Sequence, residues 1–254
     1  MSLPRTPSAS LCGRNAIIVG ASSGIGLGCA VALGELGADV TIAARRGDML
    51  DAVGDDMRAA GMLVKTLAMD ITDITAMQGL IAANGPFDVM VNSAGMARHS
   101  PAMDTSQDDF DAVTNLNIKS AYFLTQAVAN GLIAAKKPGS LINISSQMAL
   151  VGGIERAVYA ATKHAVEGFT KSMAIEWGPH DIRVNTICPT FIRTSLSAQT
   201  FSQPDKAAWI ESKIKLGRIG TVEDIMGAVQ FLASDMSALV TGSALLIDGG
   251  WTAD

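Results

Sequence analysis

The stretch GASSGIG, residues 20–26, follows the β-branched run Asn15–Val19 and precedes a helical pattern. Strand, glycine-rich turn and helix in this order predict the first βα unit of a dinucleotide-binding fold. Gly20 allows a tight turn, Gly24 lets backbone N–H groups approach a pyrophosphate, and Gly26 lets the helix pack close to the sheet. The alternative interpretation is a glycine-rich connection that binds no ligand.

The rest of the chain repeats the alternation of strand and helix. It predicts an α/β fold: one doubly wound, Rossmann-type parallel sheet of seven strands with helices on both faces. We expect a single domain over residues 1–254, because no linker divides it, with residues 1–12 as a loose N-terminal extension and residues 190–218 as a substrate-binding lid. The further strands are expected at residues 40–43, 63–69, 87–91, 140–144, 182–188 and 244–247. A long helical region is expected over residues 104–136, and Thr221 is expected to cap a later helix.

Composition excludes several classes of partner. The chain is 48% hydrophobic with a formal net charge of −5, and its charges are mixed in sign without a basic block, so a nucleic-acid partner is not expected. No apolar run is long enough to span a bilayer, so no membrane partner is expected. Cys12, Cys29 and Cys188 are too few and too scattered for a disulfide framework. No metal-ligand spacing occurs, so we expect no metal and a reduced, cytoplasmic protein.

Tyr159 and Lys163 are four residues apart, which places a phenol and an ammonium on one face of a helix. An ammonium one turn away can stabilise a phenolate and so allow a tyrosine to exchange protons near neutral pH. Ser146 lies thirteen residues before the tyrosine, after a strand-like run. The plainer interpretation is that the pair only decorates a helix surface. Together the three residues predict a proton-transfer site.

With Ser146, Tyr159 and Lys163 behind the turn at residues 20–26, the sequence resembles the short-chain dehydrogenase/reductase family from about Gly13 onward. The resemblance implies that the tyrosine is the general acid/base and that the serine holds the substrate oxygen. It also implies that the lysine activates the tyrosine and binds the nicotinamide ribose.

Asn117 fits the position of a family asparagine that distorts its helix and anchors a water linking the lysine to solvent. An interior asparagine is a weak helix former, although a plain polar helix residue is the alternative.

Ala44-Arg45-Arg46 follows the second strand, where an NAD-specific site would carry an acid. A guanidinium can hold a 2′-phosphate bidentately, so we expect NADP(H) in preference to NAD(H), with Arg45 providing most of the preference and Arg46 sharing it. The alternative is an ordinary solvated arginine pair. Asp70 is expected either to contact the adenine or to cap the next helix.

The sequence and the resemblance together give a set of site residues. The expected catalytic residues are Ser146, Tyr159, Lys163 and Asn117. The expected cofactor-binding residues are Gly20, Ser22, Ser23, Gly24, Ile25, Gly26, Arg45, Arg46, Asp70, Ile71, Asn92, Ala94, Gly95, Tyr159, Lys163, Pro189, Ile192 and Thr194. The expected substrate residues are Gln147, His99, Gly153 and Phe191.

These residues predict an NADP(H)-dependent oxidoreductase that acts on a carbonyl or secondary alcohol of a small substrate, a sugar, polyol, sugar acid or 3-oxoacyl thioester. The alternatives are a nucleotide-binding sensor or scaffold without turnover, and a sugar-nucleotide epimerase or dehydratase of the related extended family. The stripe Ala161, Ala165, Phe169 and Met173 is expected to be core first and a subunit contact second. With the apolar strand at residues 244–247 it predicts a homo-oligomer, expected to be a tetramer.

Overall fold

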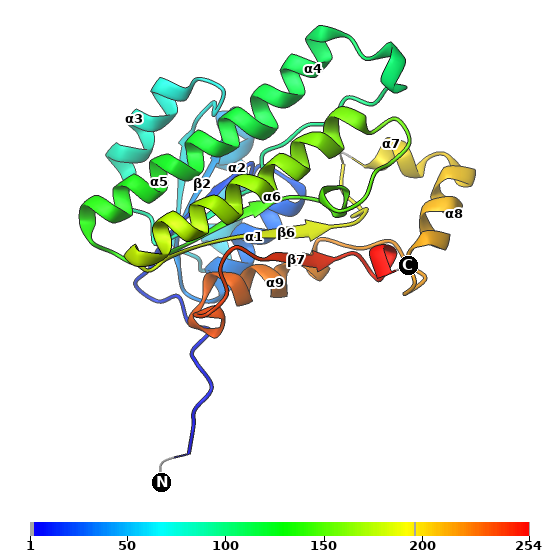
Figure 1. Cartoon of the computed structure of the whole chain (residues 1–254). Coiled ribbons are helices and arrows are strands. Elements are labelled where there is room, and N and C mark those ends of the chain that lie inside the picture. Colours follow the sequence, from blue (N-terminus) through cyan, green and yellow to red (C-terminus); the bar gives the residue numbers. More distant parts are fainter. Residues whose placement is uncertain (1–2, 196, 254) are drawn as a thin grey trace.

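The computed structural model describes residues 3–195 and 197–253. Within them, seven parallel strands form one sheet in the order β3-β2-β1-β4-β5-β6-β7, as predicted (Figure 1). The strands are β1 (Asn15–Val19), β2 (Asp39–Ala44), β3 (Val64–Ala68), β4 (Val89–Asn92), β5 (Gly139–Ile144), β6 (Ile182–Pro189) and β7 (Ala244–Ile247). The α-helices are α1 (Gly24–Glu35), α2 (Gly47–Ala59), α3 (Ile74–Asn84), α4 (Gln107–Thr114), α5 (Ala121–Ala135), α6 (Ala157–Trp177), α7 (Ala198–Phe201), α8 (Pro204–Lys213) and α9 (Glu223–Ala233).

The side chains of the central strands alternate between two hydrophobic cores, because successive residues of a strand point to opposite faces of the sheet. In β1, Ala16 and Ile18 pack into the core formed with α1, α2 and α9. Ile17 and Val19 pack into the core formed with α3, α5 and α6. Figure 1 shows these two helical layers on opposite sides of the sheet. Burial on both faces explains why the strands read as continuous apolar runs.

The sheet reverses its winding direction between β1 and β4, which pair with each other although two strands separate them in sequence. In open α/β sheets, ligands bind outside the carboxyl ends of the strands at such a switch point. Here the segments that leave the two strands stay close together. A Cβ atom added to Gly20 would lie 2.8 Å from the backbone nitrogen of Ala94.

Gly26, in the first turn of α1, has no room for a side chain. A Cβ atom there would lie 2.2 Å from the carbonyl oxygen of Gly20, which belongs to the backbone and cannot move aside. The close packing that the sequence predicts for this glycine is therefore present. It brings the first turn of α1 against the end of β1.

We expect Gly26→Ala to lower the free energy of unfolding by about 2 to 3 kcal/mol, because the methyl group must force the turn and α1 apart. Gly79→Ala is the matched control, since Gly79 lies within α3 with nothing within 4 Å of its added Cβ. That change should stabilise the protein by about 0.5–1 kcal/mol through helix propensity. Chemical denaturation followed by circular dichroism measures both. Equal unfolding midpoints for the two variants would contradict the packing argument.

The helical region predicted over residues 104–136 is interrupted. A short 3₁₀ turn, η1 (Ala102–Asp104), precedes α4, and a π-helical turn, η2 (Asn115–Ser120), joins α4 to α5. Ser106 ends the gap after η1, and its side chain accepts a hydrogen bond from the backbone N–H of Asp109 to cap α4. The sequence located the helical region but not the gap between η1 and α4, because the cap that begins α4 depends on a single serine.

One predicted helix cap is wrong, and the structure rules out another cap that was one of two alternatives. The N-cap of α9 is Val222, without a side-chain cap bond, whereas the Asp224 carboxylate accepts from the backbone N–H of Thr221. The cap of α3 is Asp73, which accepts from the backbone N–H of Ala76, so Asp70 does not cap this helix. In both cases an acidic residue close by in the sequence makes the local hydrogen bond instead.

Two predictions about burial also need correction. Of the stripe on α6, only Met173 is buried, while Ala161 is exposed, because α6 turns the side that carries Lys163 and Val166 toward the sheet. The N-terminal extension is shorter than predicted, since Leu11 is fully buried and its N–H donates to the carbonyl of Leu36. Within the described residues, no helix is both long and apolar enough to cross a membrane.

Candidate active site

A cavity of about 710 Å³ opens at the switch point, and the glycine-rich turn forms one of its walls. Ser22, Ser23 and Gly24 line it, and Ser23 is the N-cap of α1 but makes no side-chain bond to the first turn. The N–H groups of that turn therefore have no side-chain partner and can bind an anion, which the positive end of the helix dipole also favours. Gly20 leaves room that a side chain would fill. This cradle fits the pyrophosphate of a dinucleotide.

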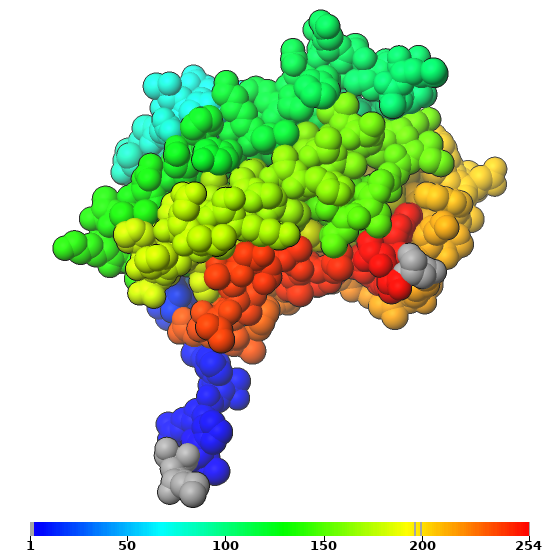
Figure 2. Space-filling view, viewed as in Figure 1, coloured from blue at the N-terminus to red at the C-terminus, as the bar shows by residue number. Residues whose placement is uncertain are grey.

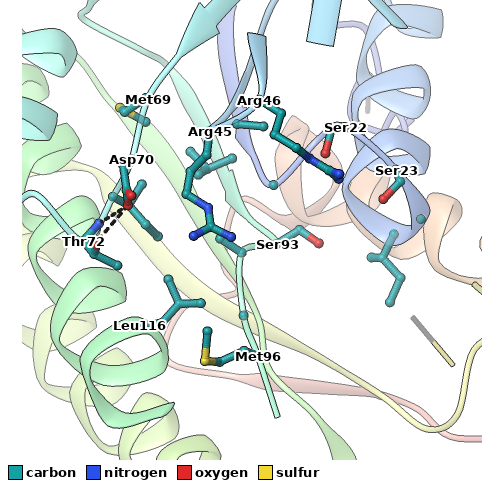
Figure 3. A pocket seen from close by; sticks show the side chains of 18 of the residues that line it. Ser22, Ser23, Arg45, Arg46, Met69, Asp70, Thr72, Ser93, Met96 and Leu116 are labelled. Carbon is teal, nitrogen blue, oxygen red and sulfur yellow. Dashed lines mark hydrogen bonds between the residues drawn. The ribbon is translucent and has the colours of Figure 1, made fainter. Parts of the chain in front are cut away.

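The end of β2 supplies two arginines and no carboxylate to this cavity. Figure 3 shows the guanidinium of Arg46 extending toward Ser22 and Ser23, whereas Arg45 extends across the cavity on the side of Ser93. The two cations thus face different parts of the cavity wall. An anionic group attached to a bound dinucleotide would find a cation on either side.

Asp70 lies at the rim of the same cavity, where its Oδ1 accepts hydrogen bonds from the backbone N–H of Thr72 at 2.9 Å and from the Thr72 hydroxyl at 2.7 Å. These bonds lower the pKa of the Asp70 carboxyl below its ordinary value, and the charge of Arg45 acts in the same direction. The group is therefore a carboxylate at neutral pH and can accept a hydrogen bond from an amino group.

Tyr159 and Lys163 share one face of α6, as their spacing predicts. The Nζ atom of the lysine lies 5.6 Å from the centre of the tyrosine ring and donates to the carbonyl of Ile144 at 2.9 Å. Ser146 begins the short 3₁₀ turn η3 (Gln147–Ala149), which packs against α6. Its Oγ accepts from the backbone N–H of Met148 at 3.1 Å, so its own hydroxyl hydrogen remains free to donate. A strand end and a facing helix thus bring the three residues together.

Asn117 lies in the π-helical turn, which confirms the predicted distortion of the helix. Its Oδ1 accepts from the backbone N–H of Met96 at 2.9 Å, and its Nδ2 donates to the carbonyl of Met96 at 2.8 Å and to Thr162 Oγ1 at 3.2 Å. The amide thereby connects the loop after β4 to α6. Gly95 adjoins this connection, because an added Cβ would lie 3.9 Å from the Nζ of Lys163. The cavity wall therefore extends close to Lys163.

Ring contacts occur at two of the residues predicted to bind substrate, His99 and Phe191. The ring of His99 meets the tyrosine ring edge to face at 6.3 Å between centres. Phe191, after β6, packs on Trp251 at 5.7 Å and on Phe201 at 6.4 Å. Desolvation of the imidazole and the positive charges of Arg156 and Lys206 lower the pKa of His99 to about 4. The ring is therefore neutral at pH 7 and can exchange hydrogen bonds without adding charge.

Gln147 is almost fully buried directly after Ser146, and neither its Oε1 nor its Nε2 has a hydrogen-bond partner. A buried primary amide without partners is costly, so it suits the hydroxyl group of a ligand. Gly153, also predicted to contact substrate, lies close to two flexible side chains: an added Cβ would be 2.9 Å from Met148 Cε and 3.0 Å from Arg156 Cγ.

Most of the predicted cofactor residues line the cavity. They are Gly20, Ser22, Ser23, Gly24, Ile25, Arg45, Arg46, Asp70, Ile71, Ala94, Gly95 and Thr194. Gly26, Asn92, Tyr159, Lys163, Pro189 and Ile192 are not among the lining residues. The Asn92 amide instead donates to Asn143 and accepts from the N–H of Ala94, which holds the chain as it leaves β4.

Sequence reasoning missed ten residues that line the cavity. They are Val19, Ala44, Met69, Thr72, Ser93, Met96, Ala112, Asn115, Leu116 and Ser195. Most of the missed residues at strand ends are direct neighbours of predicted residues in the sequence. Including one or two more residues after each predicted strand would have found them. The three from α4 and η2 carry no such signal, because only the fold brings these helices to the cavity. Among the described residues, no group of His, Cys, Asp and Glu could hold a metal ion.

Known proteins match the chain over nearly its full length. A family model described as enoyl-(acyl carrier protein) reductase matches residues 20–252. D-erythrulose reductase from Gallus gallus is 36% identical over 245 residues, which are 96% of this chain and 98% of that protein. The 2-dehydro-3-deoxy-D-gluconate 5-dehydrogenase from Escherichia coli is 36% identical over 248 residues, which are 96% of this chain and 97% of that protein.

A solved structure is also similar to this chain over nearly its full length. The crystal structure of a gluconate 5-dehydrogenase from Burkholderia cenocepacia, in complex with NADP and tartrate, superposes with a TM-score of 0.92. It shares 32% sequence identity, and the match covers 97% of this chain and 98% of that one. The similarity therefore includes the cavity, the residues around Tyr159 and the segment after β6.

Proposed function

The chain belongs to the short-chain dehydrogenase/reductase family, and we propose that it transfers hydride between NADP(H) and a carbonyl or secondary alcohol group of a small sugar or sugar acid. The observation that carries this proposal is the pair of Tyr159 and Lys163 beside a glycine-lined cavity. The Nζ atom of Lys163 lies 5.6 Å from the centre of the Tyr159 ring. The relatives named above support it, because their names specify reductases and dehydrogenases of sugars and sugar acids.

The cofactor is NADP(H), as in the solved relative, and the cavity residues suit its successive parts. We assign the pyrophosphate to the turn at residues 20–26, the 2′-phosphate to Arg45 and Arg46, and the adenine to Asp70 and Ile71. The ribose next to the nicotinamide would be held by Tyr159 and Lys163. The remaining predicted residues, Asn92, Ala94, Gly95, Pro189, Ile192 and Thr194, would border the rest of the nicotinamide half.

NADPH, when bound, supplies the hydride that reduces the carbonyl carbon. The hydroxyl groups of Ser146 and Tyr159 donate hydrogen bonds to the carbonyl oxygen, and Tyr159 then transfers its proton to it. The ammonium of Lys163 stabilises the phenolate that remains. Asn117 holds the helix in its widened turn, where a water returns the proton from solvent.

The alternative, a nucleotide-binding sensor without turnover, would need the cavity but not the groups around Tyr159. A hydroxyl free to donate on Ser146 and an unpartnered buried amide on Gln147 have no purpose in such a protein. We therefore favour an enzyme, with Gln147, His99, Gly153 and Phe191 as residues on the substrate side.

The test is a panel of ketoses, keto sugar acids and 3-oxoacyl thioesters, each incubated with the protein and NADPH while absorbance at the NADPH band is followed. Cofactor oxidation that depends on a sugar or sugar acid supports the proposal. Binding of NADPH without oxidation by any member of the panel would identify a sensor instead, and turnover confined to thioesters would assign another substrate class.

We also propose that the protein is a homotetramer in the cytoplasm. Exposed apolar side chains lie on α5 and α6, with Tyr122 38% exposed and Ile175 78% exposed, and Leu246 on the edge strand β7 is 37% exposed. Figure 2 shows α6 and β7 side by side on one broad face of the molecule. The helices α5 and α6 and the edge strand β7 are separate parts of this surface, and each part can pair with its own copy and so build a tetramer. We expect sedimentation equilibrium to give the mass of four chains at micromolar concentration, and a monomer would contradict the proposal.

A further inference from the structure

The substrate side of Tyr159 contains a cation without a partner. Arg156, three residues earlier in the chain, is half-buried, and its guanidinium lies over the ring of Phe191 at 5.9 Å. Its guanidinium forms no hydrogen bond or ion pair in the described part of the chain, and the exposed neighbour Glu155 acts on it only electrostatically. A guanidinium has five N–H donors and is stable in a partly buried place only when an acceptor satisfies them.

Arg156 faces the same space as the predicted substrate residues. Its charge and that of Lys206, on α8, both act on His99, whose ring contacts Tyr159. Arg156 also interacts electrostatically with Tyr159 itself. The start of α6, the loop after β4 and the segments after β6 thus converge beside Tyr159, and the positive charges of Arg156 and Lys206 both act on His99 there.

The neighbouring arginines have other surroundings. Arg98, on the loop after β4, is ion-paired with Asp109 on α4. Arg193 is exposed and lies over the ring of Phe201 at 5.3 Å. Arg45 and Arg46 line the cofactor cavity. Arg156 therefore combines three properties: partial burial, the absence of a partner and a place beside the reacting tyrosine.

We propose that Arg156 binds the terminal carboxylate of the substrate and so selects keto sugar acids over neutral ketoses. This inference rests on the proposed function. The flat guanidinium matches a carboxylate with two parallel hydrogen bonds, and the neighbouring His99, neutral at pH 7, can serve a hydroxyl group along the sugar chain. A neutral ketose would leave the guanidinium unsatisfied. A sugar phosphate should bind less well than a carboxylate, because its group carries two negative charges and one half-buried guanidinium would be its main ligand.

Two substrates isolate the carboxylate. 5-Dehydro-D-gluconate and L-sorbose have the same carbon skeleton and stereochemistry, and they differ only in a carboxylate that is replaced by a hydroxymethyl group. L-Sorbose 6-phosphate places a phosphate at the same end. We would measure kcat and KM for all three with NADPH, using the wild-type chain, Arg156→Gln, Arg156→Lys and the control Arg98→Gln. The control removes one positive charge from a residue that already has a partner.

The wild type should prefer the acid to L-sorbose. Arg156→Gln should lower kcat/KM for the acid about ten- to thirtyfold, mostly through KM, and change that for L-sorbose less than about threefold. Arg156→Lys should keep part of the preference, and Arg98→Gln all of it. An equal loss on acid and ketose, or a wild type that prefers L-sorbose or its phosphate, would overturn the assignment.

A binding measurement separates this inference from the proposed function. Calorimetry compares the binding of D-gluconate and D-glucitol, a second pair that differs only in the carboxylate. It uses the complex with NADP⁺ and a Tyr159→Phe background, in which the proton transfer is blocked. Tighter binding of gluconate that is lost in Arg156→Gln supports the carboxylate site whatever the turnover. Equal binding of the two, or no binding of either, refutes it. Failure of the whole carbonyl panel with NADPH would instead refute the proposed function.

Discussion

Tyr159→Phe is expected to lower kcat by about a thousandfold or more while leaving the affinity for NADPH nearly unchanged. The change removes only the hydroxyl that donates the proton, and the ring that Lys163 and His99 approach stays in place. Because the phosphate-binding turn lies at the other end of the cofactor, the loss of one hydroxyl beside the substrate should cost little binding. Steady-state kinetics and fluorescence titration with NADPH measure the two quantities separately.

The chain provides its own control for this experiment. Tyr122, the other tyrosine, lies on α5 with its ring against Phe123 and Phe169 and is 38% exposed. Tyr122→Phe makes the same chemical change far from any proposed chemistry and should leave kcat as it is. If Tyr159→Phe retained most of the wild-type rate, another group would have to donate the proton.

The sequence predicted the centre of the sheet well because β1, β2, β4, β5 and β6 are buried on both faces. Such strands need unbroken apolar runs, and these runs show in the sequence without any knowledge of their partners. β1 and β7 have the predicted bounds, and the other strands shift by one or two residues. Phe87, for example, is the first residue of the predicted strand, whereas β4 begins at Val89. Phe87 is buried, but it precedes the first residue that pairs with β1.

The orientation of α6 was harder to predict, because small residues occur on more than one of its sides. Ala161 and Ala165 suggested a buried stripe, but the side that faces the sheet carries Lys163, Val166 and Thr170. A buried lysine is costly unless its charge is satisfied, and here the carbonyl of Ile144 accepts its hydrogen bond. That the catalytic lysine lies on the buried side follows from this contact rather than from hydrophobic periodicity.

Most of the proposed catalytic and cofactor residues could be predicted because they lie at the end of a strand or at a fixed spacing along one helix. Arg156 could not, since it is the N-cap of α6 and its spacing of three residues from Tyr159 carries no chemical signal by itself. Its significance depends on the packing of its guanidinium against Phe191, a residue from another part of the chain. Contacts of this kind form only when the fold is complete, and they are the ones that select the substrate.

Replacing both Arg45 and Arg46 by alanine is expected to nearly equalise kcat/KM for NADPH and NADH, a loss of preference of about ten- to a hundredfold. No carboxylate follows β2 to hold a bare 2′-hydroxyl, so the preference depends on attraction of the 2′-phosphate by these cations. Both side chains are exposed at the cavity, which limits the strength of each interaction.

The single variants show how the two arginines divide this preference. The sequence predicted a leading role for Arg45, but in the structure Arg46 is the one that extends toward Ser22 and Ser23, and Arg45 experiences the charge of Asp70. We therefore expect each single alanine variant to keep part of the preference, and the remainder to fall as salt screens the phosphate. Kinetics with both cofactors at low and high ionic strength test this. A preference that survives the double change would show that the phosphate binds elsewhere, because no other cation lines this part of the cavity in the described residues.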